Sequence, residues 1–437
     1  MAVLNFPSGF LWGTAVSSHQ VEGNNTNNNW YRWEQEGHTR ELSALACDWW
    51  SGRWMEDLDR VQETGQNTLR FSVEWSRIQP KPDIWDEEAL GKYREMAGEM
   101  AKRGIMPMLT LHHFTDPLWF FDMGGWENPS SPELFEKYTR KVALALQDYV
   151  NYWITINEPN IYALSGSVTG DFPANSMGLK SAMLVLRNMC KAHASAYRAI
   201  HEMQPKAHVG YALHYRPMKP ARPWFFLDRI MAGIQYRGIN MAFPSAIASG
   251  IMKTPIGNYK IPEAKNSQDF VGLNYYSVDT VKFDPIKPGQ LFAHRYYPKG
   301  SDLSESGFIA NEPEGLLDSI QWAAETFPGV DILITENGVE DSSDSLRPRY
   351  LVEHVYSVWK AINAGFPVKA YYHWSLTDNF EWERGWTQRF GLWHLDPLSQ
   401  KRTKRHSASI YEKICKGNAI DKGLLKEYSR KFDVTCG

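Results

Sequence analysis

Short apolar runs alternate with longer amphipathic stretches along most of the chain. The short runs have the length and the β-branched and aromatic content of buried strands, and the longer stretches repeat apolar positions at helical spacing. Strands are predicted at Phe10–Ser17, Thr68–Val73, Met106–Leu111, Tyr152–Ile156, His208–Leu213, Phe270–Tyr275, Asp331–Thr335 and Val368–His373. Helices are predicted at Glu88–Arg103, Glu133–Tyr149, Ala182–Met203, Trp224–Ile239, Glu314–Phe327, Arg347–Ala364 and Ser407–Lys416. This alternation is typical of βα units around a parallel sheet.

Eight strands with intervening helices favour the α/β class and a (β/α)8 TIM barrel, whose active site lies at the C-terminal ends of the strands. No Pro/Ser-rich linker, low-complexity tract or short repeat interrupts the sequence, so residues 1–437 are predicted to form a single domain. A doubly wound sheet is the structural alternative. That fold would need a glycine-rich phosphate turn after the first strand, and no GxGxxG or P-loop pattern occurs there.

Composition narrows the expected partners and location. A formal net charge of −3 and a pI near 6.5 give no reason to expect nucleic acid or a membrane surface as a partner. The four cysteines form no CxxC pair, which favours a reducing compartment. The N-terminal segment lacks a signal-peptide pattern, and no apolar run reaches the ~20 residues of a membrane-spanning helix. We therefore predict a cytoplasmic protein.

Aromatic content points to carbohydrate. The chain has 18 Trp and 21 Tyr, and many of the Trp stand beside polar residues instead of inside apolar runs. Part of this content must form the core, because aromatic side chains provide much of the burial in a large domain. Indole rings also stack on the C–H faces of sugars, so the composition is a first indication of a sugar ligand.

Two glutamates stand directly after predicted strands, in Thr155–Pro159 and Ile334–Gly338. Pro159 removes a ladder donor and ends the first strand, and Gly338 permits a sharp exit from the second. Hydrolysis of a glycoside requires two carboxyl groups on either side of the bond, about 5–5.5 Å apart in a retaining enzyme. A lone glutamate at such a position is best interpreted as a rim salt-bridge partner. The pair, Glu158 and Glu336, favours catalysis.

Both segments match the catalytic motifs of a known family. Further matches occur at Phe6–Gly13, Gln20–Gly23, Arg70–Ser72, Leu111–Phe114, Asn274–Tyr276 and Trp374–Trp382. With these motifs in one order, essentially the whole chain resembles glycoside hydrolase family 1, the β-glucosidase family. The resemblance implies a retaining β-glycosidase that hydrolyses terminal non-reducing β-D-glucosyl residues of small glycosides and oligosaccharides. β-Galactosides and β-fucosides are close alternatives, and no cofactor or metal is implied.

The resemblance also assigns roles. Glu336 would attack the anomeric carbon, and Glu158 would protonate the leaving oxygen and later activate water. Arg70 would keep Glu336 ionised through its nearby charge, and Tyr276 would form a hydrogen bond with it. Asn157 and Asn274 would contact the sugar near its 2-hydroxyl. The sugar would be bound by Gln20, His113, Trp126, Trp374, Glu381, Trp382 and Phe390.

Glu381 bears on the substrate class. Its carboxylate can accept hydrogen bonds from two adjacent hydroxyls and would repel a 6-phosphate, which implies an unphosphorylated sugar. The chain departs from the usual family pattern at His19, where Tyr is more common, and at Phe308, where many members carry Trp beside the leaving group. The polar segment Ser301–Ser306 is short, and the resemblance implies an open entrance there.

Other functions remain as alternatives. A sugar-binding barrel without activity would be favoured by loss of a motif glutamate, and both are present. A transglycosylase would use every residue named above, so the sequence leaves hydrolysis and transfer open. The neighbouring His112 and His113 have no HExxH or carboxylate spacing, and no metal site is predicted from them.

Overall fold

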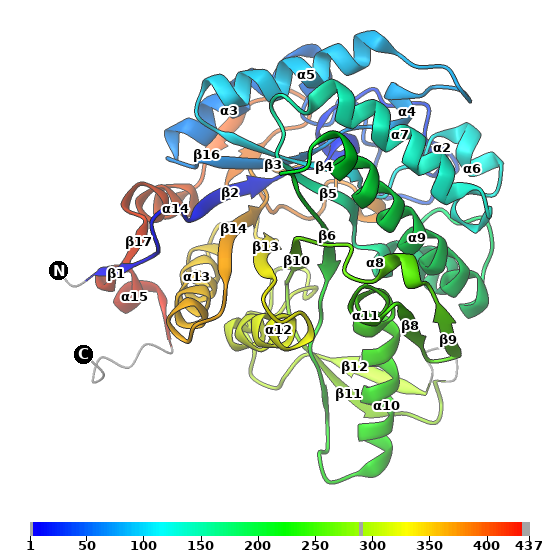
Figure 1. Ribbon diagram of the computed structural model, residues 1–437. Helices are drawn as coiled ribbons and strands as arrows, with labels where there is room; N and C mark the ends of the chain where they lie inside the picture. The colour runs from blue at the N-terminus through cyan, green and yellow to red at the C-terminus, as the bar shows by residue number, and fades with distance from the viewer. Residues whose placement is uncertain (1–2, 288–291, 431–437) are drawn as a thin grey trace.

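A closed barrel of eight strands lies at the centre of the computed structural model, which describes residues 3–287 and 292–430. Each strand runs parallel to its two neighbours, and helices surround the ring (Figure 1). In ring order the strands are β2 (Leu11–Ala15), β3 (Thr68–Ser72), β4 (Met106–His112), β5 (Tyr152–Asn157), β6 (His208–His214), β10 (Phe270–Asn274), β13 (Asp331–Asn337) and β14 (Val368–Trp374). The predicted fold class and all eight predicted strands are therefore confirmed.

Long helices follow most of the barrel strands. They are α3 (Trp54–Glu63), α5 (Glu87–Lys102), α7 (Ser131–Leu146), α9 (Leu179–Met203), α10 (Phe226–Tyr236), α11 (Ala242–Ser249), α12 (Pro313–Thr326), α13 (Arg347–Asn363) and α14 (His406–Gly417). The predicted helices correspond to seven of these nine, and α3 and α11 were not predicted. Local chemistry fixes the ends: Asp86 caps α5 by accepting a hydrogen bond from the Ala89 amide at 2.9 Å.

Shorter elements complete the fold. The short helices are α1 (Ser18–Val21), α2 (Asn29–Gln35), α4 (Trp75–Ile78), α6 (Leu118–Asp122), α8 (Pro159–Leu164) and α15 (Lys422–Tyr428). The 3-10 and π turns are η1 (Trp49–Ser51), η2 (Gly125–Glu127), η3 (Ser165–Thr169), η4 (Arg237–Met241), η5 (Pro262–Ala264) and η7 (Trp382–Arg384). Strands outside the barrel are β1 (Val3–Asn5), β7 (Met218–Pro220), β8 (Ile251–Thr254), β9 (Gly257–Lys260), β11 (Asp279–Phe283), β12 (Ala293–Tyr296), β15 (Trp393–Leu395), β16 (Arg402–Lys404) and β17 (Ala419–Asp421).

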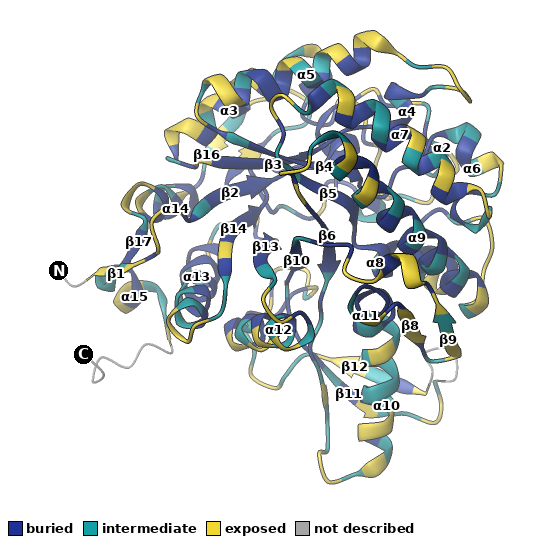
Figure 2. Ribbon diagram, viewed as in Figure 1, coloured by how far each residue is buried: buried dark blue, intermediate teal, exposed yellow. Residues whose placement is uncertain are grey.

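Burial is as expected for a ring of strands surrounded by a layer of helices. Figure 2 shows barrel strands in the colour of buried residues and helices with one exposed face each. Residues of β3 and β10 are buried throughout, because helices cover the outside of the ring and side chains fill its inside. The two ends of the chain are joined, since β1 pairs antiparallel with β17.

The register shifts in three barrel strands near their C-terminal ends. The shifts lie between Ile154 and Asn157 in β5, between Leu273 and Asn274 in β10, and between Ile334 and Asn337 in β13. Such irregularities redirect side chains and are common beside active sites. Here they occur where predicted site residues stand.

Two further properties bear on the predicted surroundings of the protein. Over the described residues, no helix combines the length and the apolar character that a membrane crossing requires. Cys47, Cys190 and Cys415 are buried free thiols, and Cys436 lies outside the described residues.

Candidate active site

Glu158 stands at the mouth of the barrel between β5 and α8. Its backbone is left-handed, with φ of 44° and ψ of 56°, and Pro159 directly after it begins α8. A non-glycine residue in this region is strained, and such strain concentrates at functional sites. The residue is 6% exposed. Its Oε1 accepts a hydrogen bond from Asn274 Nδ2 at 2.8 Å and lies 3.2 Å from His214 Nδ1.

Glu336 lies near the end of β13 and is held by two donors. Arg70 on β3, fully buried, donates from Nη1 to Glu336 Oε1 at 2.6 Å. The Tyr276 hydroxyl donates to Oε2, also at 2.6 Å. Both carboxylate oxygens are therefore fixed in direction, which is what an attacking group needs.

One hydrogen-bond network connects the two glutamates. Arg70 Nη2 donates to Asn157 Oδ1 at 2.6 Å, and Asn274 Nδ2 donates to the same oxygen at 3.0 Å. Asn274 also donates to Glu158, so the network runs from Glu336 to Glu158 without a break. Arg70, Asn157, Asn274 and Tyr276, which the resemblance assigned to catalytic support, are brought together.

Two threonines that were not identified from the sequence form hydrogen bonds with Asn274 and Arg70 and so fix the network between the two glutamates. Thr335 Oγ1 donates to Asn274 Oδ1 at 2.6 Å, which fixes the orientation of the amide. Thr110 Oγ1 accepts from Arg70 Nε at 3.1 Å. Both lie on barrel strands and are buried, so the groups that touch the glutamates are held by rigid elements.

Gly338 is needed for a reason other than the predicted sharp turn. Its φ is not in the left-handed range. A Cβ at this position would lie 2.0 Å from the carbonyl oxygen of Trp374 on the neighbouring strand. Glycine is required here because two backbones approach closely beside Glu336.

Both glutamates open into one cavity of about 720 Å³. Seven further side chains from the predicted site line it: His113, Asn157, Tyr276, Trp374, Glu381, Trp382 and Phe390. Arg70 and Asn274 lie behind this lining and act through their hydrogen bonds. Within residues 3–287 and 292–430, no cluster of three His, Cys, Asp or Glu could hold a metal ion.

The prediction that Trp126 binds the sugar is wrong for this structure. Trp126 is 1% exposed and packs edge-on against Phe120 and Phe135, away from the cavity lining. Its indole N–H donates to Asp116 at 3.0 Å and is therefore already satisfied. The missed residue is Phe114, which follows β4 directly and lines the cavity.

Gln20 supports the site from behind the cavity lining. Its side-chain amide nitrogen, Nε2, donates to the Phe380 carbonyl at 2.7 Å and to Asn379 Oδ1 at 3.0 Å. Ser17 donates to its Oε1 at 2.6 Å. With these contacts Gln20 fixes the segment that leads to Glu381.

Four flat rings form a layered wall on one side of the cavity. His113 is stacked between Trp374, at 5.9 Å, and Trp382, at 6.1 Å between ring centroids. Trp382 is also stacked on His19, at 5.8 Å. His19 Nε2 lies 2.8 Å from Glu34, so the departure from Tyr at this position places a second imidazole in the wall.

Protonation states follow from burial and neighbouring charge. Burial raises the pKa of Glu336 to about 7; Arg70 opposes this rise and the Glu158 carboxylate adds to it. The expected effect of Arg70 is present, but burial outweighs it. Burial also raises the pKa of Tyr276 far above its usual value, with Glu336 adding to the rise, so Tyr276 stays a donor. Burial and Arg70 lower the pKa of His113, and its ring is neutral.

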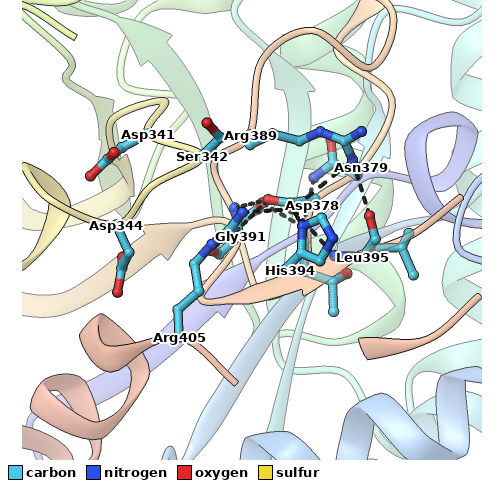
Figure 3. Close-up of polar contacts among 12 residues, drawn as sticks. Asp341, Ser342, Asp344, Asp378, Asn379, Arg389, Gly391, His394, Leu395 and Arg405 are labelled. Carbon is cyan, nitrogen blue, oxygen red and sulfur yellow. Dashed lines mark hydrogen bonds and ion pairs between the residues drawn. The ribbon is translucent and has the colours of Figure 1, made fainter. Parts of the chain in front are cut away.

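The segment that carries Glu381 and Phe390 is anchored by a buried ion pair that was not predicted. Figure 3 shows Asp378 at the centre of converging donors. Arg405 donates to both oxygens of Asp378, at 2.7 and 3.0 Å, and Gly391 N donates at 2.9 Å. Asp378 is fully buried and Arg405 is 7% exposed. The pair ties this segment to the start of α14.

We expect Asp378→Asn to lower the free energy of unfolding by about 3–5 kcal/mol, because it leaves the buried Arg405 without a counter-ion. The measurement is urea unfolding of variant and wild type. The control is Asp122→Asn, which breaks an exposed pair with Arg32 whose side chains are 54% and 37% exposed. It should cost about 0–1 kcal/mol. Equal losses in the two variants would refute the anchoring role.

Comparison with known proteins places this site in a family. Residues 3–420 match the family described as Glycosyl hydrolase family 1. The chain belongs to glycosyl hydrolase family 1. This family consists of retaining glycosidases that act on β-glycosides.

Individual relatives match this chain over nearly its whole length. The chain is 31% identical to β-glucosidase A of Thermotoga maritima, over 96% of this chain and 100% of the relative. It is 28% identical to a β-galactosidase of Sulfolobus acidocaldarius, over 97% of each. Among solved structures, a β-glycosidase from Pyrococcus horikoshii superimposes with a TM-score of 0.91 at 35% identity, with 98% of each chain covered.

The entrance of this family 1 site is built around Phe308. Phe308 lines the cavity, is 40% exposed, and has the Arg384 guanidinium 4.0 Å from its ring centroid. Ser304 and Ser306 in the segment before it both donate to Glu340, so that polar segment is held against the body of the protein. The aromatic group at the entrance is therefore a phenyl ring without an N–H donor.

Proposed function

We propose that this cavity removes terminal non-reducing β-D-glucosyl residues from small glycosides, with Glu336 as nucleophile and Glu158 as acid and base. The observation that carries the proposal is the continuous network that holds two glutamates at one cavity. A rim salt bridge would need only one of them.

In the first step, an oxygen of Glu336 attacks the anomeric carbon while Glu158 gives its proton to the glycosidic oxygen. The bond to the leaving group breaks, and the sugar stays attached to Glu336 as an ester. In the second step Glu158 removes a proton from water, the water attacks the same carbon, and the Glu336 carboxylate is released. Arg70 and Tyr276 stabilise that carboxylate through their hydrogen bonds.

Sugar recognition is supported by groups left available at the cavity. Asn157 Nδ2 lies 3.2 Å from His113 Nε2, and because only the amide can donate, the proton of this neutral ring is on Nδ1. Nδ1 is buried and has no partner among the described residues, which suits a sugar hydroxyl. Glu381 accepts from the Trp374 indole at 3.1 Å, so a second wall of the site carries a carboxylate that is fixed in place.

The substrate order proposed is β-glucoside first, then β-galactoside and β-fucoside, because a carboxylate at Glu381 can accept from either configuration of the 4-hydroxyl. A 6-phosphate would meet this buried acidic group, whose pKa is raised well above its usual value, mainly by burial. Initial rates on the p-nitrophenyl β-glycosides of glucose, galactose, fucose and glucose 6-phosphate test this order. Turnover confined to the phosphorylated sugar would refute the role of Glu381.

We expect Tyr276→Phe to move the acidic limb of kcat/KM to higher pH. The nucleophile must be ionised, and the Tyr276 hydrogen bond favours the ionised form and lowers the pKa of Glu336. Its loss raises that pKa, so activity disappears at a higher pH as the solution is acidified. A pH–rate profile of the variant checks this. An unchanged acidic limb would mean that it follows the ionisation of a group other than Glu336.

We further propose that the whole chain acts as one catalytic unit in a reducing, cytoplasmic setting. The predicted site residues extend from Gln20 to Phe390, and the pairing of β1 with β17 joins the two ends. The free, buried thiols of Cys47, Cys190 and Cys415 are compatible with that compartment.

A further inference from the structure

The outer part of the cavity has one wall that begins beside Glu158. His214, which contacts Glu158, ends β6, and Arg216 follows two residues later and lines the cavity. β11 and β12 pair antiparallel and continue this wall; Figure 1 shows them with α10 in the lowest part of the view. Because Glu158 protonates the leaving oxygen in the proposed function, this wall faces the leaving group and not the sugar.

Three cationic side chains of this wall line the cavity: Arg216, Lys287 and Arg295. The wall has a single carboxylate among the cavity-lining residues, Asp279. Arg216 Nε lies 2.9 Å and Arg295 Nη1 lies 3.7 Å from the same Oδ2 of Asp279. One negative charge is thus shared by two guanidinium groups.

The polar atoms of this cluster are incompletely satisfied. Arg216 Nε and Asp279 Oδ2 are buried, and although close together they form no aligned hydrogen bond. Lys287 Nζ is 2.9 Å from His294 Nδ1, and no salt bridge to Lys287 occurs within residues 3–287 and 292–430. Arg216 and Arg295 share the one carboxylate of Asp279, and Lys287 has no salt bridge among the described residues. The cluster therefore carries positive charge that these residues do not neutralise.

Charge differs across the cavity. Elsewhere in the lining, Arg384 pairs with Glu383, 3.1 Å apart, and Asp171 is exposed. The sugar end has Glu158, Glu336 and Glu381. Among the described residues of the lining, basic side chains outnumber acidic ones only in the cluster of Arg216, Lys287 and Arg295 with Asp279, so an anion is best placed there.

We infer that this wall is a leaving-group subsite for an anionic substituent, such as a carboxylate or sulfate, on the aglycone of a β-glycoside. The inference rests on the proposed function, because it takes Glu158 as the boundary between sugar and leaving group. The guanidinium groups offer paired N–H donors that match an oxyanion, and Lys287 adds a point charge. The chemical steps are unchanged: Glu158 still protonates the glycosidic oxygen, and the aglycone departs with its anionic substituent intact.

The test compares 4-(2-carboxyethyl)phenyl β-D-glucoside with its carboxamide. The substituent is separated from the ring by two methylene groups, so the two phenols leave equally well and differ only in charge at the far end. We expect the wild type to have a kcat/KM roughly tenfold higher for the carboxylate, the effect of one charge-assisted contact. The preference should shrink at high ionic strength.

Two variants locate the effect. The double variant Lys287→Gln, Arg295→Gln should bring the carboxylate-to-carboxamide ratio close to one. Lys282→Gln should retain the wild-type ratio, because Lys282 is an exposed lysine on β11 outside the cavity lining. The carboxamide is an internal reference, since a folding defect lowers both rates and leaves their ratio unchanged.

Failure of this inference differs from failure of the proposed function. Equal wild-type rates on the two glucosides, or a preference that persists in the double variant, would overturn the anionic subsite while leaving the hydrolase intact. Absence of turnover on both, and on p-nitrophenyl β-glucoside, by folded wild-type protein would overturn the proposed function itself.

Discussion

Glu336→Gln is expected to lower kcat on p-nitrophenyl β-glucoside by at least about 10⁴-fold, since removing a nucleophile from a covalent mechanism has effects of this order or larger. The amide keeps the size of the side chain and can still accept hydrogen bonds from Arg70 and Tyr276, but it cannot form the glycosyl ester. The fold should persist. Steady-state rates, with circular dichroism as the folding check, measure the effect.

Glu340→Gln is the matched control for this loss. Glu340 lies four residues further along the chain, is 2% exposed and bonds to Ser304 and Ser306 outside the cavity lining. Its conversion should change kcat less than tenfold, roughly the scale of a substitution that leaves the reacting groups in place. A Glu336→Gln enzyme as active as Glu340→Gln would show that Glu336 is not the nucleophile.

Glu158→Gln is expected to have a second large effect, and one that depends on the leaving group. Proton donation contributes about 10²–10⁴-fold, so hydrolysis of an alkyl β-glucoside should fall by that amount. With 2,4-dinitrophenyl β-glucoside the first step needs little protonation, and its kcat/KM should fall far less. The comparison of kcat/KM for the two substrates measures the difference.

Azide provides the companion experiment. In Glu158→Ala, azide can reach the ester on Glu336 without a general base and should restore turnover, with β-glucosyl azide as product. Equal losses on good and poor leaving groups, or an α-glucosyl azide from this variant, would remove Glu158 from the acid/base role.

Much of the fold could be predicted because barrel strands carry a strong local signal. Each of the eight runs is buried on both faces, and its apolar length alone locates it within two residues at either end. Helix α3 was missed although Trp54, Leu58 and Val61 have helical spacing and are buried. Helix α11 contains Pro244, which weakens a helical pattern read from sequence.

The catalytic part of the site could be predicted for a geometric reason. Parallel strands that close into a ring bring their C-terminal ends to one rim, so Arg70, Asn157, Glu158, Asn274 and Glu336 had to come close once the barrel was assumed. The register shifts then set which of them touch. His214 carried the same signal, directly after the predicted strand His208–Leu213, and its contact with Glu158 could have been found in that way.

Residues on long loops could not be placed by this argument. Strand register does not determine the direction of a loop, so Trp126, well beyond the end of β4, was wrongly assigned to the sugar while Phe114 was overlooked. The Asp378–Arg405 pair joins residues 27 positions apart with no shared periodicity. The cationic wall likewise depends on the pairing of β11 with β12.

Covalent trapping identifies the nucleophile without relying on a variant. In a 2-deoxy-2-fluoro-β-glucoside, the fluorine slows both the formation and the hydrolysis of the glycosyl-enzyme. A good leaving group restores the rate of the first step alone, so the glycosyl-enzyme accumulates. Mass spectrometry of a digest then identifies the labelled residue. We expect the label on Glu336, in the peptide that contains Thr335, Glu336 and Asn337. A label on Glu158 or on any other residue would contradict it.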